Sequence, residues 1–74
     1  MTTYITTRRR NGRGERRQMS AHSTLGAAID AANALRLRLG EAIDVVAWFV
    51  DQAEPPCIAA CVLRDGEVRQ SAHQ

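Results

Sequence analysis

The chain has 74 residues, of which 45% are hydrophobic and 24% are charged. This size and composition are typical of one small domain with one modest core, and they exclude a disordered chain. No apolar run reaches the ~20 residues that a membrane-spanning helix needs, and the first residues lack the charged-then-apolar order of a secretory signal. We therefore expect a single soluble, cytoplasmic domain over residues 1–74.

The charge is divided unevenly along the chain. Residues 1–22 contain six arginines and one acidic residue, whereas residues 23–74 contain four arginines and seven acidic residues. The guanidinium group suits phosphate and carboxylate recognition, because its planar fork donates several hydrogen bonds. A GC-rich genome also produces chains that have arginine and no lysine, as here. The basic segment is nevertheless the strongest functional signal in the sequence.

The first predicted element is a β-hairpin over about residues 2–21. Residues 2–10 are rich in β-branched and aromatic side chains, which favour a strand. The pair Asn11-Gly12 follows, and such a pair is typical of a tight hairpin turn because both turn residues must accept a positive φ. A flexible basic arm is the alternative interpretation of this segment.

The returning strand of this hairpin is predicted over residues 13–21. Period-two alternation would place Arg17, Met19 and Ala21 on one face. Gly14 weakens the strand or marks a β-bulge. The hairpin would then have its arginines crowded at the tip.

The second predicted element is a helix over about residues 24–39, with Ser23-Thr24 as its N-cap and Gly40 as its stop. Its apolar residues recur at helical spacing; they are Leu25, Ala28, Ile29, Ala32, Leu35 and Leu39. The many alanines predict close packing of this helix on a sheet. A helix that binds a partner is the alternative.

Further strands are predicted over residues 43–50 and 57–64. The first is apolar on both faces, which is typical of a central strand, and the loop after it ends in Pro55-Pro56, which cannot continue a ladder. Asp65-Gly66 turns the chain into a short strand at 67–70. The sequence therefore predicts an α+β fold, β-β-α-β-β with a possible short fifth strand, in which one helix covers one face of an antiparallel sheet.

A single helix leaves one side of the third strand without a cover. That side carries Val46, Trp48 and Val50, and exposed apolar patches usually mark interfaces, where tryptophan is a common anchor. A second copy of the chain or a foreign protein would cover it. The alternative is that Trp48 is a core residue and Phe49 lies at the rim.

Metal and disulfide sites are not expected. Cys57 and Cys61 lack the two-residue spacing of zinc knuckles, and His22 and His73 lie far from them. On a strand the two cysteines would be about 13 Å apart, too far for a disulfide. Buried, reduced thiols are the default interpretation.

Catalytic motifs are not found either. No serine or cysteine is flanked by motif glycines, and the acidic residues form no pair by spacing. Gly12-x-Gly14 lies in a hairpin rather than between a strand and a helix, so it is not a phosphate loop. We expect no enzyme activity, no catalytic residues and no cofactor.

The candidate partner-binding residues are the arginines of the hairpin, with Trp48 as an apolar anchor. These arginines are Arg8, Arg9, Arg10, Arg13, Arg16 and Arg17. They would contact phosphates of a nucleic acid or an acidic patch on a protein; a solvated tip without a partner is the third interpretation. Tyr4 is the only aromatic residue in this half of the chain, which argues against stacking on single strands.

Several short motifs occur in a fixed order over roughly residues 1–50. They are Met1-x-Thr3-Tyr4-Ile5, Gly14-Glu15-Arg16, Ala21 before the helix, Ala27-Ala28 and Ala31-Ala32 within it, and Leu39-Gly40-Glu41 at its end. In this order they resemble the second-described family of type I-E anti-CRISPR proteins. After Val50 the chain departs from that pattern. The layout, a strand pair, an alanine-rich helix and further strands, also resembles other small anti-CRISPR proteins.

The resemblance implies a non-catalytic phage protein that inhibits by binding. Its partners would be protein subunits of a type I surveillance complex (Cascade) and crRNA phosphates, and it would block access of target DNA or recruitment of the nuclease. A different class is a small DNA-binding regulator, an antitoxin or repressor, that uses the arginine strands as a β-ribbon. A third class is an accessory subunit that is stable only within an assembly. The sequence leaves monomer and homodimer open.

Overall fold

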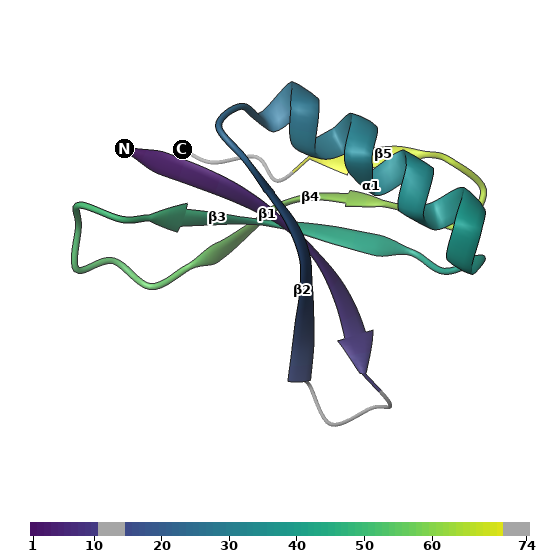
Figure 1. Cartoon of the computed structure of the whole chain (residues 1–74), viewed down its shortest axis with the longest axis horizontal. Coiled ribbons are helices and arrows are strands. Elements are labelled where there is room, and N and C mark those ends of the chain that lie inside the picture. The colour runs from purple at the N-terminus through teal and green to yellow at the C-terminus, as the bar shows by residue number, and fades with distance from the viewer. Residues whose placement is uncertain (11–14, 71–74) are drawn as a thin grey trace.

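A computed structural model describes residues 1–10 and 15–70. The elements in chain order are β1 (Thr2–Arg10), β2 (Glu15–His22), α1 (Leu25–Leu39), β3 (Ile43–Phe49), β4 (Cys57–Val62) and β5 (Val68–Gln70). The five strands form one antiparallel sheet in the order β2-β1-β3-β4-β5, and α1 packs on one face of it (Figure 1). The predicted α+β fold is confirmed, including the short fifth strand.

Two sequence predictions fall on residues that the structure does not describe. The Asn11-Gly12 turn and the weak point at Gly14 lie outside the described residues. The pairing of β1 with β2 confirms the hairpin itself. Among the described residues, no helix has both the length and the apolar character to cross a membrane.

Both ends of α1 are capped as the sequence predicts. The Thr24 Oγ1 accepts a hydrogen bond from the Ala27 N–H at 3.2 Å, which satisfies one of the unpaired donors of the first turn. At the other end Gly40 adopts a left-handed conformation with φ of +66°, and its N–H donates to the Arg36 carbonyl at 2.8 Å. These two caps fix where the helix begins and ends.

Exchanging the two glycines of this region for alanine is expected to change stability in opposite directions. Gly40→Ala places a Cβ in the left-handed region and should lower the free energy of unfolding by about 1–2 kcal/mol. At Gly26, the second residue of α1, an added Cβ would meet no atom within 4 Å, so Gly26→Ala should raise that free energy by up to about 1 kcal/mol. Urea denaturation of both variants measures this. Equal effects would contradict the assigned helix end.

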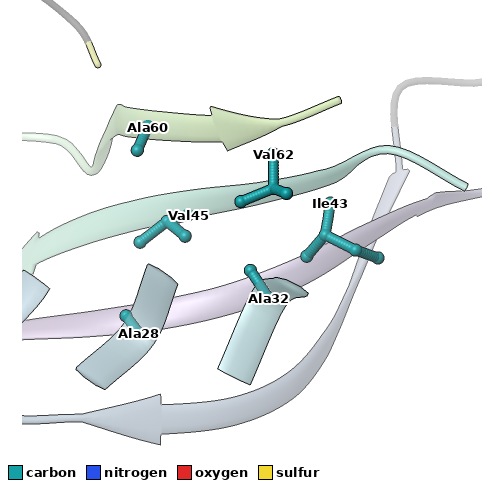
Figure 2. Close-up of a cluster of buried hydrophobic side chains, with 6 residues drawn as sticks. All are labelled: Ala28, Ala32, Ile43, Val45, Ala60 and Val62. Atoms are coloured by element: carbon teal, nitrogen blue, oxygen red, sulfur yellow. The ribbon is translucent and has the colours of Figure 1, made fainter. Parts of the chain in front are cut away.

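The core is a thin layer between α1 and the centre of the sheet. Its fully buried members come from the helix and from β3 and β4 (Figure 2); they are Ala28, Ala32, Ile43, Val45, Ala60 and Val62. The two helix alanines face the larger residues of β3 and β4, so the backbone of α1 approaches the sheet closely. The predicted packing of the helix on the sheet is confirmed, with Ala28 and Ala32 as the buried alanines of α1.

A β-bulge in β2 corrects one prediction about the hairpin. Ser20 pairs with Thr6 and Gln18 pairs with Thr7, so Met19 is the extra residue. Arg17 consequently pairs with Arg8, and Ala21 pairs with Ile5. Because Ile5 and Arg8 are three residues apart on one strand, Arg17 and Ala21 lie on opposite faces. The prediction that they share a face with Met19 is wrong, since strict alternation does not hold across a bulge.

A second bulge, between β3 and β4, separates the two cysteines. Cys57 pairs with Ala47, whereas Cys61 pairs with Asp44. Ala47 and Asp44 are three residues apart, so the cysteines lie on opposite faces of the sheet. Neither is in a disulfide, and both side chains are only partly buried. The expectation of reduced thiols agrees with this placement, although the expectation of full burial does not.

Candidate functional site

The end of the hairpin extends beyond the rest of the sheet. β1 pairs with β3 only over residues 2–7, whereas it pairs with β2 as far as Arg10. Residues 8–10 and 15–17, which we call the arginine arm, therefore form a two-stranded extension. Figure 1 shows β1 and β2 running away from α1 and past the other strands.

Five of the six candidate arginines belong to the described arm. In the register of the hairpin Arg8 is opposite Arg17, Arg9 is opposite Arg16, and Arg10 is opposite Glu15. Arg13 lies outside the described residues. Like charges opposite one another on paired strands are destabilising. The Arg9–Arg16 pair therefore opposes pairing of the two strands, which favours an interpretation in which the arm binds an anionic partner; Arg8 of the other pair has a carboxylate partner within the chain, Glu41.

Arg8 has a contact within the chain. Its Nε donates to both carboxylate oxygens of Glu41, at 3.0 and 2.8 Å. Glu41 directly follows Gly40 at the end of α1, so this ion pair connects the base of the arm to the helix terminus. Arg8 was named from the sequence as a partner-binding residue, but its contact with Glu41 gives it a different role, which is to position the arm relative to the helix. No local sequence pattern pairs it with a residue 33 positions away.

Removing the charge of Glu41 is expected to have a small effect. The side chains of Arg8 and Glu41 are 40% and 35% exposed, so Glu41→Gln should lower the free energy of unfolding by at most about 1 kcal/mol, less at high salt. The control is Glu67→Gln, because Glu67 is 3.8 Å from Arg69 in a more exposed pair. Urea denaturation at low and high salt compares them. A larger loss at Glu67 would contradict the anchoring role of Arg8.

The face of the sheet opposite α1, which we call the open face, carries Trp48. Its exposed fraction is 45%, whereas its neighbour Phe49 is partly buried and Val46 is half-buried. Trp48 is therefore not a core residue, and the alternative that made it one is wrong. The uncovered apolar surface predicted at Val46 and Trp48 is present, and Val50 is exposed just beyond the end of β3.

A shallow apolar hollow of about 280 Å³ lies beside Trp48 on this face. Its lining residues come from β1, β2, β3 and the loop before β4; they are Ile5, Thr7, Gln18, Val46, Trp48 and Pro56. The sequence indicated Val46 and Trp48 but missed the other four. No signal in the sequence identifies them, because the register between strands decides which residues become neighbours.

The hollow and the arginine arm are continuous along the hairpin. Thr7 and Gln18 are opposite one another and line the hollow. Two positions further along the strands, Arg9 is opposite Arg16. Because alternate residues of a strand share a face, these two arginine positions follow the hollow on the open face. A ligand in the hollow would reach the arm.

A chain of polar contacts at the base of the hairpin was also missed by sequence reasoning. The Oγ1 of Thr6, a fully buried residue, lies 2.6 Å from the Oγ of Ser20, which lies 2.8 Å from the Nε2 of His22. The signal was the spacing Ser20-x-His22, which puts both residues on one face of a strand. These contacts satisfy a buried hydroxyl group. Within the described residues, no cluster of His, Cys, Asp or Glu is suited to a metal ion.

No protein-family model, no curated protein and no solved structure matches this chain. The candidate surface combines guanidinium groups, which recognise carboxylates and phosphates, with an apolar hollow next to an exposed tryptophan, which suits a protein side chain.

Proposed function

We propose that the chain is a phage-encoded, non-catalytic inhibitor that binds a crRNA-guided type I CRISPR surveillance complex in the bacterial cytoplasm. By occupying the complex it blocks access of target DNA or recruitment of the nuclease. The observation that carries this proposal is the arginine arm, which extends beyond the sheet and contains five arginines and one acidic residue. The resemblance of residues 1–50 to type I-E anti-CRISPR proteins supplies the target.

The arm supports a binding function through its shape and its chemistry. A two-stranded extension places successive residues about 3.3 Å apart along each strand, and each guanidinium donates charge-assisted hydrogen bonds to carboxylate or phosphate oxygens. A surveillance complex offers both, on its protein subunits and on the crRNA. Trp48, which is opposite Thr3 on β1, adds an apolar anchor on the open face, at the end of the hollow away from the arm. The proposal needs no cofactor.

Co-elution tests this function. The purified protein is mixed with a type I-E surveillance complex and passed through a size-exclusion column, with duplex DNA alone as the parallel sample. We expect co-elution with the complex, and loss of target DNA binding or of nuclease recruitment in the loaded complex. Elution of the protein apart from complexes of type I-E and of the other type I subtypes would contradict the proposal.

One observation favours a second candidate, a DNA-binding regulator. A two-stranded ribbon has the width that a major groove admits, and several repressors read DNA in this way. Such a protein would bind duplex DNA without the complex, with an affinity that falls steeply as salt rises. Binding in the DNA sample, with none to the complex, would replace the inhibitor by the regulator.

A further inference from the structure

An apolar stripe crosses the open face of the sheet. Its members are neighbours in register on β2, β1, β3 and β4; they are Ala21, Ile5, Val46, Trp48 and Ile58. Trp48 and Ile58 are 45% and 38% exposed. Ala21 is also exposed, whereas Ile5 at the centre of the stripe is only 6% exposed and Val46 is partly buried. Exposed apolar surface that extends over several strands usually marks an interface.

The small size of the core indicates that this interface contributes to stability. Three of the six residues of the buried cluster are alanines, its largest members are Ile43, Val45 and Val62, and the five further apolar residues that pack against it are only partly buried. A chain of 74 residues is near the limit at which one core suffices, and oligomerisation is a common supplement at this size. A second copy of the chain is a partner that is present wherever the protein is made, and it could cover the open face.

We propose that the open face is the interface of a homodimer, in which Trp48 of each copy packs in the hollow of the other. The charged residues at the two ends of the sheet favour a second copy of the chain as the partner, and they determine how the two copies are oriented. The arginine arm lies at one end of the sheet. The loop of residues 50–56, which carries Asp51 and Glu54, lies at the other end, because Thr2 pairs with Phe49 and Thr7 with Asp44.

If the two-fold axis lies in the plane of the interface and is perpendicular to the strands, the strands of the two copies run in opposite directions. This orientation therefore brings the arm of each copy to the acidic loop of its partner, in the self-complementary manner of a two-fold interface. The parallel arrangement would put arm against arm and is opposed by like charge. Asp51 already forms an ion pair with the Met1 amino group, so Glu54, which is exposed, is the carboxylate that meets the arm.

This inference does not rest on the proposed function. The arm contains five arginines, more than one Glu54 can neutralise, so a dimer retains basic surface for a further partner, whereas Trp48 is free to anchor that partner only in the monomer. Dimerisation is also compatible with the DNA-binding regulator, and the size-exclusion experiment with duplex DNA, not the oligomeric state, distinguishes the two functions.

Sedimentation equilibrium of the purified protein tests the dimer. We expect a mass of twice 8.2 kDa that falls toward the monomer mass on dilution, with a blue shift of the emission of Trp48, the only tryptophan, on association. Trp48→Ala should be monomeric at concentrations where the parent chain is dimeric. The matched control is Leu37→Ala, because Leu37 is 68% exposed on α1, and it should remain dimeric.

A charge exchange tests the orientation. Glu54→Arg and the double variant Arg9→Glu/Arg16→Glu should each weaken the dimer at least tenfold, and mixing the two variants should restore a mixed dimer. Asp30→Arg, which makes the same change of charge on exposed helix surface, should have no effect. A parent chain that is monomeric throughout would overturn the proposal, as would equal effects of Trp48→Ala and Leu37→Ala or a failure of the mixed pair to associate.

Discussion

The double substitution Arg9→Glu/Arg13→Glu is expected to abolish binding to the surveillance complex while the domain remains folded. Two reversals change the charge of the hairpin by four units, and each replaces attraction to a carboxylate or phosphate with repulsion. Disrupting one buried charge pair at an interface costs about 2–5 kcal/mol in affinity, so disrupting two weakens Kd by more than about a thousandfold. Co-elution and competition against the parent chain measure the change.

The fold should survive this change for a reason that the register provides. Arg9 is opposite Arg16, so glutamate at position 9 turns a pair of like charges into a pair of opposite charges, which favours strand pairing. Thermal denaturation at a concentration where the parent chain is monomeric should therefore show an unchanged or slightly higher midpoint. The matched control is Arg38→Glu/Arg64→Glu, two exposed positions outside the arm, which should retain binding. Unchanged affinity of the Arg9/Arg13 variant would contradict the role of the arm.

The dependence of this affinity on salt distinguishes the two kinds of anionic partner. If the arm contacts crRNA phosphates, counterion release makes the logarithm of the affinity fall linearly with the logarithm of the salt concentration. Removing one arginine should then reduce that slope by about one. If the arm contacts carboxylates on a protein subunit, salt mainly slows association and changes dissociation little.

Local sequence patterns predicted the elements of this fold because each pattern acts over a few residues. Thr24 and Gly40 marked the ends of α1, and both caps form the predicted hydrogen bonds. The apolar character of residues 43–50 on both sides identified β3 as a central strand, and it lies third of five. The same pattern predicted that the side with Trp48 would be left without a cover.

The features that define the candidate site depend on register, which no local pattern specifies. The bulge at Met19 reversed the expected face of Arg17, and it arises where Ser20 and Gln18 pair with adjacent residues of β1. Likewise, the ion pair between Arg8 and Glu41 joins a strand to a helix end 33 residues away. The hollow beside Trp48 collects residues from four segments. The arginines could thus be named from the sequence, but the residues that lie next to them in the fold could not.

A second large effect is expected in the core, from Ala32→Leu. Ala32 has no exposed surface and faces β3 and β4 across the helix–sheet interface (Figure 2). The larger side chain has no space there, so α1 must move away from the sheet, which typically costs about 1–3 kcal/mol. A domain of this length has a total stability of roughly 4–11 kcal/mol at the usual value per residue, so the loss is a large share. Urea denaturation measures it.

The control Ala34→Leu decides what the loss means. Ala34 is exposed on the same helix, and leucine and alanine have similar helix propensities, so this variant should change stability by less than about 0.5 kcal/mol. Alanine is common in GC-rich genomes, which could explain its abundance in α1 without any packing role. If Ala32→Leu were as harmless as Ala34→Leu, composition would be the better explanation. A loss confined to Ala32 means that a small side chain at this position sets the distance between helix and sheet.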